Sequence, residues 1–103
     1  MEKLVMLKNG DTLEIRSQEG IKIATVHNVQ SFRRFCFGYA AIEFITKRYA
    51  ATGKPCEFRW GFIDTEGNVV VEPKYIFASN VNKHGNAFVK FCQFGGEVIK
   101  IEK

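Results

Sequence analysis

The residue types that could bind zinc are few and widely spaced in this chain. The candidates are His27, Cys36, Cys56, His84 and Cys92. Structural zinc sites are typically built from closely spaced pairs such as Cys-x2-Cys, and no two of these residues form such a pair. Free cysteines more commonly act as small buried hydrophobic residues. We therefore predict no metal ion and no cofactor, with a site assembled only by the fold as the alternative.

Catalytic combinations are equally sparse. Nucleophilic catalysis needs a serine, cysteine or threonine beside a histidine that an acid orients. A hairpin could bring Cys92 close to His84, but their spacing matches no catalytic motif. The carboxylates are scattered and not paired for acid–base work, and Gly95-Gly96 lacks the Lys-Ser or Lys-Thr of a phosphate-binding loop. We therefore assign no catalytic residues and expect no enzymatic activity.

The composition is that of an ordinary folded domain. The chain has 103 residues, of which 46% are hydrophobic and 25% charged. This balance argues against disorder and against membrane spans, so we expect a single domain over residues 1–103. The first residues lack the features of a secretory signal peptide, and the odd number of cysteines fits a reducing compartment. These features predict a cytoplasmic protein that does not enter a membrane.

The charge of the chain suits an acidic partner. The net charge is +4, and the basic residues are spread from Lys3 to Lys103 with adjacent pairs only at Arg33–Arg34 and Lys47–Arg48. A dedicated nucleic-acid-binding protein more often has a denser basic patch. We therefore favour a protein partner of acidic character over nucleic acid.

Hydrophobic patterning predicts strands at both ends of the chain. Residues 1–27 alternate in polarity around an Asn9-Gly10 turn, which is typical of a β-hairpin and predicts a three-stranded meander. Residues 56–103 alternate again, with Val69–Val71 predicted as a short strand that Pro73 ends.

The middle of the chain predicts a helix. Over residues 28–53, apolar side chains recur at helical spacing, Asn28 or Ser31 can cap the start, and Gly53 and Pro55 end it. The core stripe of this helix would contain Phe32, Phe35, Tyr39, Ile42, Ile45 and Tyr49.

These elements together predict an α+β fold. An antiparallel β-sheet of about six to seven strands would pack against one central α-helix. Three strands would precede the helix and four would follow it. Trp60 would be buried against the helix at Phe35, Tyr39 and Ile42.

Residues 59–91 carry an ordered signature. It runs Trp60-Gly61-Phe62-Ile63-Asp64, Gly67, Val69-Val70-Val71, Pro73-Lys74-Tyr75 and Gly85-Asn86-Ala87-Phe88-Val89. This stretch resembles a single WG repeat, while residues 1–55 resemble no family. The resemblance implies an antiparallel β-unit in a bacterial or phage protein, and a scaffold or binding module without assigned chemistry. Its structural residues would be Trp60, Gly61, Asp64, Gly67, Pro73, Tyr75 and Gly85.

One face of the predicted helix is the candidate partner-binding surface. Phe37 and Phe44 fall seven positions apart among basic residues, and exposed apolar strips of this kind mark interfaces. The alternative is a helix buried on both sides, under the sheet or in a homodimer. The full predicted surface comprises Arg33, Phe37, Ala40, Ala41, Phe44, Lys47 and Arg48.

The predicted function is a non-catalytic protein-binding module. The small size of the chain fits a stoichiometric inhibitor, an immunity protein or an adaptor of bacterial or phage origin. The first alternative is a weak nucleic-acid-binding protein that uses a basic face, with Phe88, Phe91 and Phe94 near Lys83 and Lys90 as stacking residues. A small enzyme of unknown chemistry is the least favoured interpretation.

Overall fold

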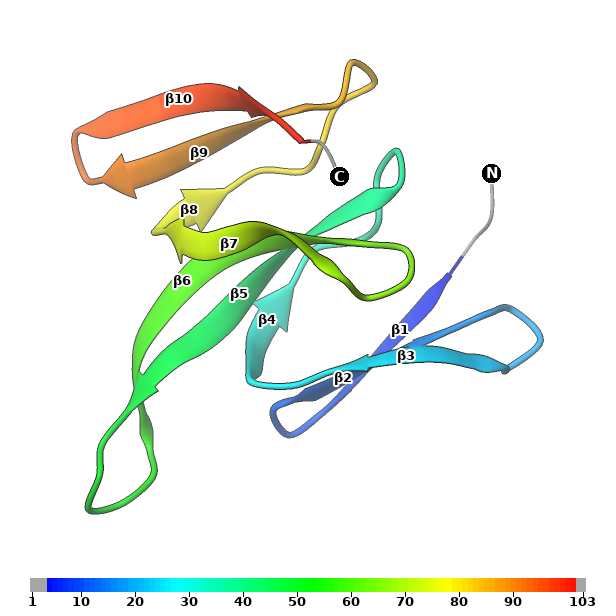
Figure 1. Cartoon of the computed structure of the whole chain (residues 1–103), viewed down its shortest axis with the longest axis horizontal. Coiled ribbons are helices and arrows are strands. Elements are labelled where there is room, and N and C mark those ends of the chain that lie inside the picture. The colour runs from blue at the N-terminus through cyan, green and yellow to red at the C-terminus, as the bar shows by residue number, and fades with distance from the viewer. Residues whose placement is uncertain (1–3, 102–103) are drawn as a thin grey trace.

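The protein is all β. The computed structural model describes residues 4–101, which form ten strands and no helix. The strands make three antiparallel sheets, with the orders β1-β2-β3, β4-β5-β6-β7 and β10-β9-β8 (Figure 1). Their bounds are β1 Val5–Asn9, β2 Thr12–Arg16, β3 Lys22–Val26, β4 Val29–Phe32, β5 Tyr39–Arg48, β6 Pro55–Asp64, β7 Val69–Tyr75, β8 Phe77–Ala78, β9 Asn86–Cys92 and β10 Gly95–Lys100.

The predicted α+β fold is therefore wrong, because residues 28–53 contain no helix. They form β4, a turn, β5 and the loop that leads to β6. Asn28 and Phe37 have φ angles of 60° and 52°, and Gly38 has a φ of 91°. Backbone angles in this left-handed region are incompatible with a continuous right-handed helix.

The strand β5 is buried on both faces, which explains the misleading pattern. Ala40 and Ile42 point to one side of the sheet, and Ala41 points to the other. All three side chains are almost fully buried. A strand that is covered on both faces loses the polar–apolar alternation by which strands are recognised in sequence.

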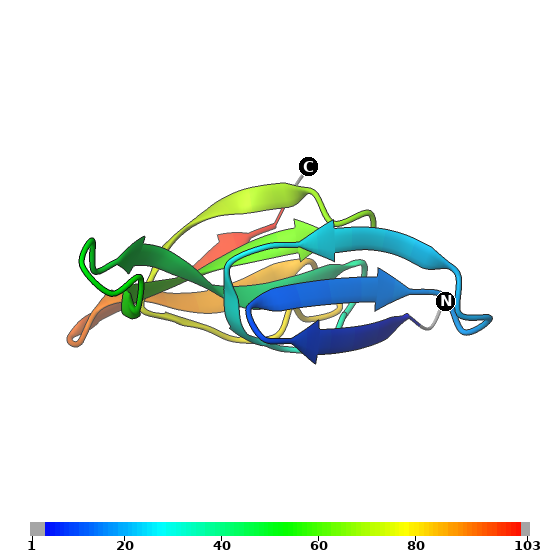
Figure 2. The ribbon, with the colours of Figure 1, turned by 90° about the horizontal axis from the view of Figure 1, so that it is seen from below.

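The four-stranded sheet is the middle layer of the molecule. Figure 1 shows it between the two three-stranded sheets, and Figure 2 shows β1, β2 and β3 in front of the remaining strands. Two clusters of buried residues fill the spaces on its two sides. One comprises Leu13, Ile15, Val26, Val29, Ala40, Ile42, Phe44 and Ile63. The other comprises Ala41, Trp60, Phe62, Tyr75, Ala78, Val81, Ala87, Val89 and Ile101.

Several strand predictions at the two ends of the chain are confirmed. The Asn9-Gly10 hairpin is confirmed, since β1 and β2 pair from Asn9 opposite Thr12. The strands predicted from the alternation over residues 56–103 include β6, β9 and β10, and residues 102–103 lie outside the described part of the chain. The short strand β8 was not predicted, and β7 continues beyond Pro73 to Tyr75.

Gly67 allows the C-terminal half to pack closely against the N-terminal meander. A Cβ atom placed on this glycine would lie 2.7 Å from the Cβ of Ala24 on β3. Its φ of 85° also lies in the region that favours glycine. The turn between β6 and β7 can therefore pack closely against the meander only with glycine at this position.

Candidate partner-binding site

The partner-binding face predicted on a helix does not exist as one surface. Ala40 and Ala41 are almost fully buried, and Phe44 is only 8% exposed, whereas Phe37 is 50% exposed. Phe44 packs in the cluster beside the meander, and Phe37 lies in the turn before β5. The two rings therefore form no continuous apolar strip.

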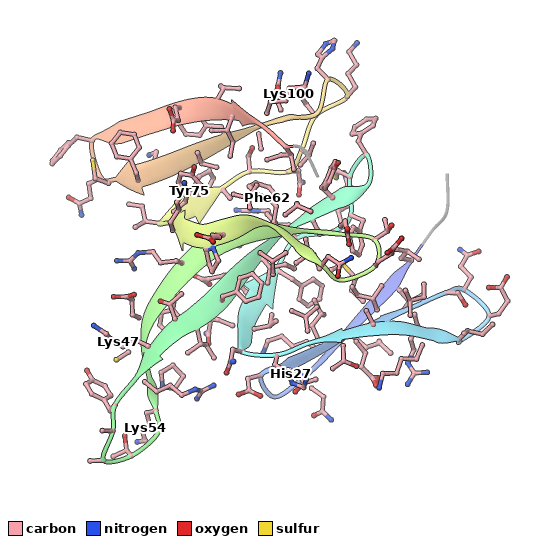
Figure 3. The ribbon with its side chains drawn as sticks, in the orientation of Figure 1. His27, Lys47, Lys54, Phe62, Tyr75 and Lys100 are labelled. Atoms are coloured by element: carbon pink, nitrogen blue, oxygen red, sulfur yellow. The ribbon has the colours of Figure 1, made fainter. Side chains whose placement is uncertain are left out.

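The basic residues of that predicted face also separate. Lys47 is exposed on the β5–β6 hairpin (Figure 3). Arg48 is held by Asp11, with its Nη2 atom 2.7 Å from a carboxylate oxygen, and donates a further hydrogen bond to the carbonyl of Gly53. Arg33 lies on the opposite side of the middle sheet from Phe44, stacked on Trp60.

The candidate chemical residues are not brought together. Among residues 4–101, no group of three or more His, Cys, Asp or Glu side chains is placed to hold a metal ion. His84 lies in the turn before β9, and Cys92 is the last residue of that seven-residue strand. The strand therefore separates the pair by roughly 20 Å at about 3.3 Å per residue.

The signature residues of the C-terminal half have structural roles. Trp60 and Tyr75 are paired across β6 and β7 and are both buried. Figure 3 shows Phe62 and Tyr75 where β6, β7 and β8 meet. Trp60 packs in the same cluster as Phe62, and Tyr39 packs against this cluster, but Ile42 and Phe35 belong to the other side of the sheet. The predicted burial of Trp60 is confirmed, and the predicted helix against which it would pack is wrong.

Gly61 and Pro73 form one local feature. Between the pairs Trp60–Tyr75 and Phe62–Val71 the register shifts, so that β7 bulges opposite Gly61. Pro73 sits in this bulge and does not end the strand, contrary to the prediction from sequence. A bulged edge strand tolerates proline because the missing N–H would make no ladder hydrogen bond there, and β7 is the edge of its sheet.

Asp64 organises the turn between β6 and β7. Its side chain is almost fully buried, and its Oδ1 atom accepts hydrogen bonds from the backbone N–H groups of Glu66 and Asn68, both at 2.9 Å. The side-chain amide of Asn68 is a third donor, at 3.4 Å from Oδ2. Asp64 thus satisfies turn donors that would otherwise be unpaired.

We expect Asp64→Ala to lower the free energy of unfolding by about 1–3 kcal/mol, because it removes the acceptor of two partly buried hydrogen bonds from the turn backbone. Chemical denaturation measures this loss. Asp64→Asn is the matched control, because its side-chain oxygen still accepts from Glu66 and Asn68, and it should cost less. Equal stability of the alanine variant and the parent protein would contradict the assigned role.

The hairpin of β9 and β10 carries the most exposed large apolar side chain of residues 4–101. Phe94, at its tip, is 97% exposed, and Phe88, Phe91 and Val98 are also exposed. The β9–β10 hairpin extends away from the middle sheet in Figure 1. Single exposed apolar residues are ordinary, whereas exposed apolar patches are typical of interaction surfaces. Phe88 and Val98, paired across the hairpin, form such a patch.

Two of these rings also have a role within the hairpin. A Cβ atom placed on Gly96 would lie 2.6 Å from the ring of Phe88, and one placed on Gly95 would lie 2.6 Å from the ring of Phe91. The phenylalanines therefore cover the two glycines of β10, as aromatic side chains do for glycines in edge strands. Phe94 has no comparable contact, so the fold gives no reason for a phenylalanine at this position.

One face of the hairpin sheet is aromatic and basic. Residues opposite one another in antiparallel strands share a face, so the pairs Phe88–Val98, Lys90–Phe77 and Lys90–Gly96 place these side chains together. The rings of Phe77 and Phe88 are 6.4 Å apart. Glu97 pairs with Val89 and points to the opposite face.

The sequence had a signal for this surface. Alternation over residues 86–92 places Phe88 and Lys90 on one face of a strand, and these residues appeared in the nucleic-acid alternative. What sequence could not show is which face of β9 the middle sheet covers. The structure places Ala87 and Val89 against the core and leaves Phe88 exposed.

Strands β6 and β7 belong to the middle sheet, and β8 and β9 belong to the three-stranded sheet beside it, all in antiparallel pairs. Residues 60–91 match the family model described as WG containing repeat. The chain therefore carries a single WG repeat in its C-terminal half, as its signature residues predicted. A search of curated proteins found no significant match, and a search of solved structures found none either. None of the elements described here is a helix of the length and hydropathy that a membrane span requires.

Proposed function

We propose that this protein is a non-catalytic protein-binding module that uses the β9–β10 hairpin as its contact surface. The observation that carries the proposal is Phe94, a large aromatic side chain that is 97% exposed at the hairpin tip. Aromatic side chains that are exposed in the free protein and buried in a partner's pocket dominate the energy of many interfaces. Phe91 and Val98 are further exposed apolar side chains of the same hairpin.

The partner proposed for this surface is an acidic protein. The chain has a net charge of +4, and Lys90 shares a face of the hairpin with Phe88 and Val98. Complementary charge around an apolar centre accelerates association and improves specificity. A small binding module of this kind fits an inhibitor or immunity protein, which act by occupying a surface of their target.

The test is capture of partners from the native cell lysate, with and without nuclease, using the parent protein and a Phe94→Ser variant. We expect the variant to lose protein partners by about tenfold or more, as for truncation of an aromatic anchor. Its free energy of unfolding should stay within about 0.5 kcal/mol of the parent, since Phe94 is a surface residue.

Tyr49→Ser is the matched control. Tyr49 is an exposed aromatic residue beside the other long hairpin, between β5 and β6, and its removal should leave capture unchanged. Loss of partners from the Tyr49 variant but not from the Phe94 variant would place the interface elsewhere. Captured material that disappears on nuclease treatment would favour the nucleic-acid alternative.

A further inference from the structure

Arg33 is held in place by contacts that use only part of its guanidinium group. Its Nε–H donates to the carbonyl oxygen of Ala78 at 2.7 Å. Its Cζ atom lies 5.0 Å from the ring centroid of Trp60 and 5.4 Å from that of Phe77. Stacking on two rings and one hydrogen bond fix the plane of the guanidinium against the edge strand β8.

The remaining donors of Arg33 have no acceptor among residues 4–101. Both Nη atoms lack a hydrogen bond, and Arg33 takes part in none of the ion pairs of this part of the chain. The side chain is partly exposed, so the Nη groups are accessible to an acceptor from outside the chain. An arginine that is stacked on aromatic rings and keeps its fork free is the usual arrangement for recognising a planar oxyanion.

A second cation is placed next to Phe77, the ring on which this arginine stacks. Lys90 pairs with Phe77 across β9 and β8, and the ring of Phe77 lies under the Arg33 guanidinium. Lys90 also makes no ion pair within residues 4–101. The strand positions on this face, in β8, β9 and β10, include no aspartate or glutamate: Phe77, Asn86, Phe88, Lys90, Gly96, Val98 and Lys100.

We propose that Arg33 and Lys90 form a carboxylate-binding site for an acidic peptide segment that lies across the outer face of β8, β9 and β10. This inference rests on the proposed function and specifies the chemistry of its partner. A carboxylate would accept paired hydrogen bonds from the two Nη groups of Arg33. Lys90 would attract a second carboxylate, and apolar side chains of the segment would contact Phe88 and Val98.

The surface fits an acidic peptide better than a nucleic acid. A nucleic-acid backbone needs a track of cations that neutralises successive phosphates. On this face the cations Arg33, Lys90 and Lys100 are separated by the apolar side chains of Phe77, Phe88 and Val98, so they form no continuous track. Phe88 also covers Gly96 with its ring, which limits its role as a freely accessible stacking platform.

The test is a binding titration followed through the Arg33 Nε–H resonance by NMR. The probe is a short acetylated peptide in which glutamates alternate with serine and leucine. Its counterpart has every glutamate replaced by glutamine, and an oligothymidylate of similar length is the nucleic-acid probe. We expect saturable binding of the glutamate peptide that moves the Arg33 resonance and weakens as salt is raised. The glutamine peptide should bind about tenfold more weakly or not at all, because it accepts no charge-assisted hydrogen bond.

Three variants locate the site. Arg33→Lys keeps the charge without the planar fork and should weaken the glutamate peptide by about fivefold or more. Lys90→Gln removes the second cation and should weaken it as well. Lys47→Gln, an exposed lysine on β5, is the control that should leave binding unchanged. If Arg33→Lys unfolds because the stack on Trp60 is lost, Lys90→Gln still tests the site, since Lys90 is not part of the core clusters.

Equal binding of the glutamate and glutamine peptides would overturn the inference, and so would tighter binding of the oligothymidylate. Absence of any binding of the glutamate peptide, or unchanged binding by both the Arg33 and the Lys90 variants, would also overturn it. If the glutamate peptide does not bind while the Phe94→Ser variant still loses protein partners, only the proposed carboxylate site is wrong. The hairpin then remains the proposed interface.

Discussion

Trp60→Ala should lower the free energy of unfolding by about 3–5 kcal/mol, as large aromatic truncations in cores do. Trp60 is only 9% exposed, lies opposite Tyr75 on β7 and packs in the same cluster as Phe62. Its ring also supports the guanidinium of Arg33, which comes from the N-terminal half. Truncation would therefore leave a cavity and loosen a contact between the two halves of the chain.

Chemical denaturation followed by circular dichroism measures this loss. The chain has a single tryptophan, so intrinsic tryptophan fluorescence cannot report on the variant. Phe94→Ala is the matched control, because it also truncates a large aromatic residue but at a fully exposed position, and it should change stability by less than about 0.5 kcal/mol. An unchanged unfolding free energy for Trp60→Ala would show that the WG unit is not part of the core.

Gly61→Ala should cost about 3 kcal/mol or more, at the upper end of what overpacking does. A Cβ atom at this position would lie 2.5 Å from the carbonyl oxygen of Val71 and 3.0 Å from the nitrogen of Pro73. Both obstacles are backbone atoms of β7, so no side-chain rotation can relieve the contact. The two strands would have to separate at the bulge, where Trp60 and Tyr75 pack beside them.

Gly85→Ala is the informative comparison for Gly61→Ala. Gly85 has a φ of 80°, but a Cβ atom there would meet no atom within 4 Å. Its replacement should therefore cost only the left-handed backbone energy, about 1–2 kcal/mol, and asparagine should be tolerated better than alanine. Chemical denaturation of both variants compares the two losses of unfolding free energy. A cost for Gly61→Ala no greater than that for Gly85→Ala would show that β7 can move away from β6.

The middle of the chain shows why a local pattern misled. Phe32, Ile42 and Ile45 recur at helical spacing, yet Ile42 and Phe32 face each other across the β4–β5 pair. The middle strand must be apolar on both faces because sheets cover it from both sides. With that cover, strand and helix leave similar apolar runs in the sequence. The positive φ angles at Asn28, Phe37 and Gly38 break the run into strands, and Gly38 is the turn residue that the helical pattern obscured.

The exposed hairpin shows the same limit at the level of function. Alternation along β9 separates Phe88 from Val89 into two faces, but it does not say which face is covered. The middle sheet buries Val89 and leaves Phe88 exposed. The residues around Arg33 in the sequence likewise do not mark it as a binding residue. Its contacts with Trp60 and Phe77 are between residues far apart in the chain.

The sequence by itself determined the features that local chemistry controls. The Asn9-Gly10 turn, the strand pairs at both ends and the WG repeat follow from turn residues, alternation and an ordered signature over residues 60–91. Tertiary structure decided the rest. Whether β5 was a strand, whether Phe44 was exposed and whether Arg33 met Phe77 all depended on which surfaces the three sheets cover. That burial is a property of contacts between distant segments, and no local spacing encodes it.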